Sequence, residues 1–215
     1  MVMDSFAQIL DDERIGEIVI ADVCSYPEDI VKLISKIEKI NNPKIKLIVG
    51  LKNSGVYKNK MNAVFGATNE YAALIDSDNI FDKSYIDAIY VKAWQPDTIL
   101  CPSFAKPSFD YRAFSGLTID SANIKEYLNK PMFQCLLNTM NFFVNRNEYL
   151  KAWEENDRVN VADSIYFNYL WLKRGGKLYV NEGMEYQHTI HEGSNYKINC
   201  NNAGQITSDD IIKKF

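Results

Sequence analysis

The sequence predicts an α/β fold with a mostly parallel central sheet flanked by helices. Short apolar runs alternate with amphipathic stretches, which is the pattern of strands joined by covering helices. The first unit runs from a strand at residues 17–23, through a helix at 27–40, to a strand at 44–50. The chain has 215 residues, of which 47% are hydrophobic and 24% charged. This length and composition predict a single domain, residues 1–215, which could also be one part of a longer protein.

Net charge and the distribution of apolar residues argue against two classes of protein. The 24 Lys and Arg residues against 28 Asp and Glu residues give a net charge of −4, so we expect no nucleic-acid partner. No apolar run is long enough for a membrane span, and the first residues are acidic where a signal peptide is basic. We therefore expect a cytoplasmic protein. The cysteines form no C-x-x-C pair and are expected to be free thiols: Cys24, Cys101, Cys135 and Cys200.

The helix expected at Pro27–Ile40 has a start signal and an apolar face. Ser25 and Glu28 have capping-box spacing, and Pro27 lies in the first turn. The apolar residues expected to cover the sheet are Ile30, Val31, Ile34 and Ile37.

The remaining elements follow from the same periodicities. We expect strands at 71–75, 98–104, 141–145 and 177–180, the first of them buried and parallel. We expect helices at 58–67, 83–94, through Tyr149 and Trp153 and at 163–173, and a short helix or tail at 207–215. The 163–173 helix is almost entirely apolar, so it should be deeply buried. A long irregular stretch follows the strand at 98–104, and such loops are often functional.

The strongest chemical signal is Asp76-Ser77-Asp78, directly after a predicted buried strand. Ligands of open α/β sheets bind outside the carboxyl ends of the strands. Two carboxylates there would attract a hard cation such as Mg²⁺ or Mn²⁺, which commonly keeps substrate phosphates among its ligands. The alternative is that both aspartates only cap the turn and the next helix.

Several segments, taken together, resemble one enzyme family. The stretch from Gly55 to Ala63, followed by Asp76-Ser77-Asp78, resembles the G…N-x-x-x-x-A…D-x-D block of GT-A fold glycosyltransferases, family 2 in particular. Residues 141–144 resemble the strand beneath the donor sugar, and Val161-Ala162-Asp163 lies where that family has a Glu-Asp pair. Residues 191–197 resemble a C-terminal His-x-Gly…Lys segment. The resemblance implies the GT-A (nucleotide-diphospho-sugar transferase) fold.

The resemblance also implies a cofactor and a donor site. Mn²⁺ or Mg²⁺ would be held by Asp78 and His191, with Asp76 bound to the metal or to the ribose of a UDP-sugar. Neutral histidine is the ligating form, and His188 is an equally available imidazole. The other residues expected on the donor side are Ser25, Lys60, Asn62, Ser77 and Lys197.

The implied reaction moves a hexose or deoxyhexose from the UDP-sugar to a sugar hydroxyl of a glycan acceptor, with inversion. Asp163 corresponds to the second acid of the family's Glu-Asp pair, which is the general base. Asp163 could instead be only the N-cap of its helix, and Asp157 is the alternative base. The chain also resembles a virus-encoded glycosyltransferase domain, which would place it in the cytoplasm of a host cell.

Two departures from the family pattern keep other functions open. The nucleoside-binding D-x-x-S-x-D segment is absent after the second strand, and Ala162 stands where the family has Glu. One alternative is a nucleotidyltransferase, although residues 21–29 contain no glycine for a triphosphate loop. The other is a non-catalytic module that binds a nucleotide or a carbohydrate.

Overall fold

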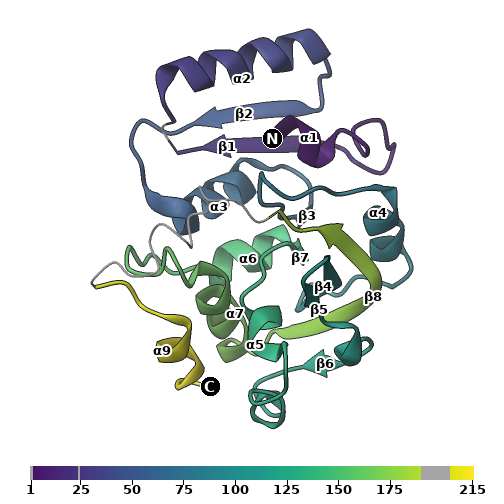
Figure 1. Cartoon of the computed structure of the whole chain (residues 1–215), viewed down its shortest axis with the longest axis vertical. Helices are drawn as coiled ribbons and strands as arrows, with labels where there is room; N and C mark the ends of the chain where they lie inside the picture. Colours follow the sequence, from purple (N-terminus) through teal and green to yellow (C-terminus); the bar gives the residue numbers. More distant parts are fainter. Residues whose placement is uncertain (1, 24, 190–203) are drawn as a thin grey trace.

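The computed structural model describes residues 2–23, 25–189 and 204–215, and it has an α/β architecture with two sheets (Figure 1). In the smaller sheet, β1 (Ile18–Asp22) pairs in parallel with β2 (Ile45–Val49), and α2 (Pro27–Ile40) connects them. The larger sheet has the order β3-β7-β4-β8-β6, with β5 paired to β4. Its strands are β3 (Tyr71–Ala73), β7 (Phe143–Asn145), β4 (Thr98–Lys106), β8 (Lys177–Gln187), β6 (Thr118–Ile119) and β5 (Phe109–Asp110).

The larger sheet is mixed, which corrects the expectation of a mostly parallel sheet. β4 and β8 are parallel, whereas β7 is antiparallel to both β3 and β4, and β6 is antiparallel to β8. The strand expected to be parallel at residues 71–75 is therefore paired antiparallel to β7 over its three residues. Since β3, β4 and β8 run in one direction, the polar residues that follow them meet at one edge of the sheet.

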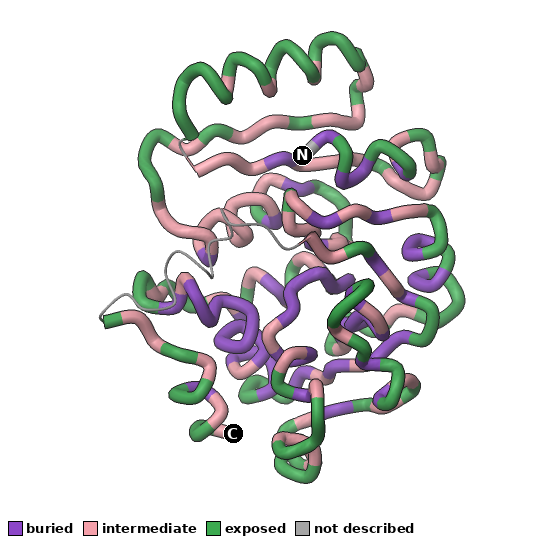
Figure 2. Tube along the Cα trace, viewed as in Figure 1, coloured by how far each residue is buried: buried purple, intermediate pink, exposed green. Residues whose placement is uncertain are grey.

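Helices cover these sheets. They are α1 (Val2–Phe6), α3 (Gly55–Gly66), α4 (Lys83–Tyr90), α5 (Phe133–Leu137), α6 (Arg146–Ala152), α7 (Asp163–Lys173) and α9 (Ser208–Ile212), with short 3₁₀ turns at Arg112–Phe114 and Ile124–Glu126. The expected bounds are confirmed for α2 and α7, whereas α4 ends four residues earlier than expected, and α1 and α5 were not expected. As expected, α7 is buried along most of its length, and buried residues concentrate around it and in β4 and β8 (Figure 2). No helix within the described ranges is long and apolar enough to cross a membrane.

Helix α2 begins differently from the expected capping box. Its N-cap residue is Tyr26, which makes no side-chain cap hydrogen bond. Ser25 instead donates from its hydroxyl to Asp22 at 2.6 Å, which closes the loop after β1. The apolar face differs in part from the expected one: Val31 and Ile34 are 65% and 39% exposed, whereas Ile37, as expected, packs against the core together with Leu33.

The N-terminal helix α1 was not expected, because five residues are too few to show a helical period. Its Met3 and Phe6 are buried in the core. Ser5 lies between them, and its hydroxyl donates to the carbonyl of Ser77 at 2.8 Å. The carbonyl of Ser5 accepts from the N–H of Phe81 at 3.0 Å. Helix α1 therefore braces the turn that carries the two aspartates.

The C-terminal segment, residues 204–215, packs against the loop before α7. Arg158 donates from Nε to the carbonyl of Gly204 at 2.8 Å, and the N–H of Ile206 donates to the carbonyl of Arg158 at 2.6 Å. The N–H of Asn160 donates to Gln205 Oε1 at 3.1 Å. The short helix or tail expected at 207–215 forms α9, with a Thr207 capping box.

Candidate active site

Asp76 lies at the carboxyl end of β3, where Asn141 fixes both its backbone and its side chain. The N–H of Asp76 donates to Asn141 Oδ1 at 2.8 Å, and Asn141 Nδ2 donates to Asp76 Oδ2 at 3.1 Å. Asn141 reaches this position because it lies two residues before β7, the neighbour of β3. The same amide donates to Tyr186 of β8 at 3.1 Å. One buried asparagine thus ties three strands of the site together.

The ammonium of Lys60 bridges two carboxylates that are far apart in the sequence. Its Nζ lies 2.8 Å from Asp163 Oδ2 and 3.1 Å from Asp76 Oδ1. Burial by itself lowers the pKa of Lys60, but the two carboxylates outweigh this effect and raise the pKa above its usual value. Burial likewise raises the pKa of Asp76, but Lys60 and Asn141 hold it below its usual value. Lys60 and Asp76 are therefore both charged at neutral pH.

Asp163 is the first residue of α7, and its carboxylate points into this cluster. The N-cap of α7 is Ala162, so Asp163 does not occupy the capping position. Its side chain is only 12% exposed. Asp157, the alternative base, is exposed in the preceding loop. The structure therefore brings Asp163, and not Asp157, into contact with the ion pair of Asp76.

His188 directly follows β8. Its ring is held by the buried Asn79, which belongs to the turn at residues 76–80, called the acidic turn below. The Oδ1 atom of Asn79 accepts from the N–H of Thr189 at 3.2 Å, which identifies it as the amide oxygen. His188 Nδ1 lies 3.1 Å from the same oxygen, so Nδ1 carries the proton. In the neutral ring Nε2 is then the atom with a lone pair. His191, the expected ligand, lies outside the described residues, as does Lys197.

The remaining expected donor residues occupy separate positions. Asn62 is on α3 with Lys60, but two positions further along and about 200° around the helix axis. It shares a face with Asn59, whose amide donates to the carbonyl of Ala21 at the end of β1, at 2.9 Å. Ser77 is exposed in the acidic turn. Ser25 lines a cavity of about 310 Å³ between α1 and α2, together with Asp22 and other residues.

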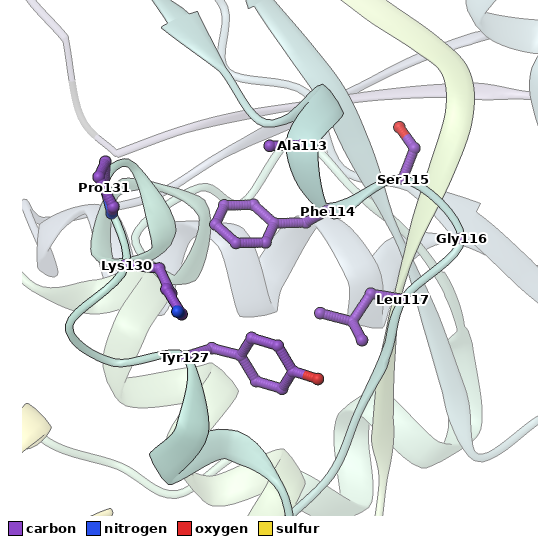
Figure 3. Close-up of a pocket in the computed structure, with 8 residues that line it drawn as sticks. All are labelled: Ala113, Phe114, Ser115, Gly116, Leu117, Tyr127, Lys130 and Pro131. Carbon is purple, nitrogen blue, oxygen red and sulfur yellow. The ribbon is translucent and has the colours of Figure 1, made fainter.

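The larger cavity lies away from this cluster. It has a volume of about 680 Å³, and Figure 3 shows the side chains of Phe114, Leu117 and Tyr127 around it with Lys130. Its wall at Gly116 is bonded to Val180, near the start of β8. The acidic turn is bonded to Gln187, roughly 23 Å further along that strand. The charged cluster and this cavity therefore lie at opposite ends of β8.

The side chains at this site are of the types that bind a divalent cation. Asp76 and Asp78 offer carboxylate oxygens, which Mg²⁺ and Mn²⁺ prefer, and a neutral imidazole suits Mn²⁺. Within the described part of the chain, no three His, Cys, Asp or Glu side chains gather closely enough to hold an ion unaided. Donor phosphates would then complete the ligand set.

The sequence of the chain matches a known family over more than half of its length. The match is to Glycosyl transferase family 2, over residues 4–153. The chain belongs to glycosyl transferase family 2. The matched range includes Lys60 and the acidic turn, whereas Asp163 and His188 lie beyond it. No curated protein sequence matches the chain, and the comparisons give no support to a viral origin.

Solved structures of glycosyltransferases share the fold of this family member. GalNAc-T7, crystallised with UDP, GalNAc and Mn²⁺, is 12% identical with a TM-score of 0.64, over 87% of this chain and 39% of its own. TarS of S. aureus is 15% identical with a TM-score of 0.63, over 89% of this chain and 34% of its own. The mannosyltransferase PcManGT of Pyrobaculum calidifontis, in complex with GDP-Man and Mn²⁺, is 12% identical with a TM-score of 0.63, over 90% of this chain and 54% of its own.

These likenesses establish a glycosyltransferase fold of the GT-A type. The chain spans between about a third and a little over half of the length of these solved structures. The sequence predicted site roles for Asp76, Lys60 and Asp163 but not the contacts among them. It did not predict Asn141 as a partner of Asp76, although a polar residue directly before an apolar run was a usable signal.

Proposed function

We propose that this protein is a metal-dependent glycosyltransferase that takes a hexose or deoxyhexose from a UDP-sugar and transfers it, with inversion, to a sugar hydroxyl of a glycan acceptor. The observation that supports this most strongly is the convergence of Asp163 with the acidic turn of β3. The two groups lie on either side of Lys60, which contacts both within 3.1 Å. Family 2 membership supports the reaction class.

In the proposed reaction, Asp163 is the general base. Its carboxylate accepts the proton of the acceptor hydroxyl, while that oxygen forms a bond to the anomeric carbon of the donor sugar. The bond from the anomeric carbon to the diphosphate breaks, and the nucleoside diphosphate leaves with the electron pair. A carboxylate with 12% exposure is well suited to this role, because few waters compete with the acceptor.

The opposite side of the site stabilises the departing diphosphate. Asp78, with Asp76 and a histidine, would hold the Mn²⁺ or Mg²⁺, which supplies positive charge to the leaving group when bound. His191 and Lys197 stay predictions, and His188 is the histidine whose tautomer leaves Nε2 as a possible ligand. Ser25, Ser77 and Asn62 are proposed donor contacts.

Calorimetry followed by a turnover assay tests this proposal. UDP-hexoses and GDP-mannose are titrated into the protein with and without Mn²⁺, and free sugar released without acceptor is then measured. Metal-dependent UDP-sugar binding with slow sugar release is the expected result. Release of pyrophosphate from a nucleoside triphosphate and a sugar phosphate would indicate a nucleotidyltransferase instead. Binding without any turnover would indicate a binding module.

A further inference from the structure

Lys60 occupies a position that conflicts with the proposed role of Asp163. An ammonium group has three N–H donors, and Asp163 Oδ2 and Asp76 Oδ1 take two of them, at 2.8 and 3.1 Å. A charge-assisted hydrogen bond must be exchanged before another hydroxyl can donate to the same carboxylate oxygen. While this contact persists, the ammonium of Lys60 occupies the Oδ2 atom of Asp163 that would meet an acceptor hydroxyl. Catalysis by Asp163 therefore requires that the ammonium leave it.

The surroundings of Lys60 allow its side chain to move while its helix stays fixed. Helix α3 is anchored at the adjacent Asn59, which donates to the carbonyl of Ala21. Gly55, at the start of the helix, has a φ of 80° and lies against Asn160, and a Cβ there would approach its side-chain oxygen to 2.2 Å. The Lys60 side chain itself is 21% exposed and has four rotatable methylenes. Its ammonium can thus reach a new anion without movement of the backbone.

We propose that Lys60 is a donor-responsive counter-ion: it neutralises Asp76 and Asp163 in the donor-free enzyme and transfers to the diphosphate when the donor binds, which releases Asp163 to act as base. This inference rests on the proposed function. A diphosphate carries more negative charge than one carboxylate, so it competes effectively for the ammonium. Asp163 then loses its hydrogen bond only when a donor is present.

The position of Lys60 also predicts an effect on the binding of a divalent cation. The ammonium lies against an oxygen of Asp76, so it repels any other cation that approaches this carboxylate. Removal of the Lys60 charge should therefore strengthen the binding of a divalent cation in the absence of nucleotide. It should also weaken the binding of UDP, because the diphosphate loses a cation partner. If Lys60 is a counter-ion, removal of its charge should therefore change the affinities for the divalent cation and for UDP in opposite directions.

Titrations of three variants test this pair of effects. Lys60→Met removes the charge and keeps most of the side-chain volume, whereas Lys60→Arg keeps the charge. Lys58→Met is the matched control, because Lys58 is on the same helix but pairs with Glu155 at the surface. The Kd of Mn²⁺ alone is measured by electron paramagnetic resonance of the free ion, and the Kd of UDP at saturating Mn²⁺ by calorimetry.

We expect Lys60→Met to bind Mn²⁺ alone about tenfold more tightly and UDP about tenfold more weakly than the wild type. Lys60→Arg should keep the wild-type Mn²⁺ affinity, and Lys58→Met should match the wild type for both ligands. Unchanged or weaker Mn²⁺ binding by Lys60→Met, with thermal unfolding like that of the wild type, would overturn the counter-ion role. Unchanged UDP binding would overturn the transfer to the diphosphate.

The experiment also separates this inference from the proposed function. If the wild type binds no UDP or other nucleotide, the proposed function fails, and the release step fails with it. The Mn²⁺ titration still reports on Lys60 by itself, because it needs no nucleotide. Tighter Mn²⁺ binding by Lys60→Met in that case would confirm the counter-ion while refuting the glycosyltransferase.

Discussion

At the first position of α7, Asp163 has a carboxylate that faces across the site instead of back onto its own helix. Helix propensities favour aspartate at a helix start for capping alone, and the sequence left that reading open. The contact with Lys60, which is 103 positions earlier in the chain, gives the residue its distinct chemistry. No periodicity or motif spacing encodes a contact over that distance. The residue identity was predictable from the sequence, but its partner was not.

Replacement of Asp163 by Asn tests the proposed base directly. Asn keeps the size of the side chain and can still accept from Lys60, but it cannot take a proton from an acceptor hydroxyl. We expect the rate of sugar transfer to fall by about 10²–10⁴-fold, with the Kd of UDP changed less than about threefold. Asp157→Asn is the control, since Asp157 is exposed outside the cluster. Loss of transfer in Asp157→Asn alone would move the role of base to that residue.

Asn141 is the residue on which the acidic turn depends most. It is 2% exposed, and its removal leaves the N–H of Asp76 without its acceptor. We expect Asn141→Ala to lower the free energy of unfolding by about 2–3 kcal/mol, measured by urea denaturation, because buried polar groups lose their partners. The exposed Asn147→Ala should change it by less than about 0.5 kcal/mol. Equal effects of the two variants would contradict this assignment.

At the level of secondary-structure elements, the side chain of Glu17, directly before β1, links that strand to β2 and to the loop after α3. Glu17 Oε1 accepts from the N–H groups of Thr68 and Asn69 at 2.5 and 3.0 Å, and Oε2 lies 2.5 Å from Lys46 Nζ. Burial raises the pKa of Glu17, but Lys46 and the two N–H groups outweigh it and lower the pKa to about 2. The free carboxylic acid of an unfolded chain has a pKa of about 4.3.

Because the folded-state pKa of Glu17 is lowered, its contribution to stability is present above pH 4.3 and is lost as the pH falls through about 2. We expect Glu17→Gln to lower the free energy of unfolding by about 1–2 kcal/mol at pH 7. The difference from the wild type should shrink as the pH falls from about 4 to 3, measured by urea denaturation at each pH. The exposed Glu13→Gln should follow the wild type throughout, and a pH-independent difference for Glu17→Gln would contradict the pKa shift.

The elements also show where sequence patterns are informative and where they fail. The long apolar run at residues 163–173 predicted both the position and the burial of α7. The prediction of parallel pairing for β3 was wrong, because a three-residue strand carries no signal of its pairing partner, which is the antiparallel β7. The capping box at Ser25 was wrong because Asp22 competes for the same hydroxyl. Short elements depend on tertiary contacts, which outweigh local propensity.

For the molecule as a whole, the site depends on residues from both ends of the chain. Helix α1 supports the acidic turn, and the C-terminal segment supports the loop that leads into α7. The sequence predicted the α/β class and the acidic turn, because these rest on local patterns. It assigned no role to either terminus, because their contacts are with segments far away in the chain.

Replacement of Gln205 tests the support given by the C-terminal segment. Gln205→Ala removes the acceptor of the Asn160 N–H, three residues before Asp163. We expect the free energy of unfolding to fall by about 1 kcal/mol and kcat for transfer to fall with little change in the donor KM. Steady-state kinetics with donor varied would measure this, with the exposed Lys213→Ala as control. A change in donor KM at constant kcat would show that this segment serves the donor instead.

The hydrogen bonds between the C-terminal segment and the loop at 158–160 affect how the chain can be divided into fragments or combined with related chains. The family match ends at residue 153, but β8 lies between β4 and β6 in the middle of the sheet. A fragment cut at that boundary would lose a central strand, α7 and the brace that follows them. Chimeras that exchange donor specificity should therefore keep residues 154–189 and 204–215 together with the matched range, since a family match can be shorter than the part of the chain that packs together.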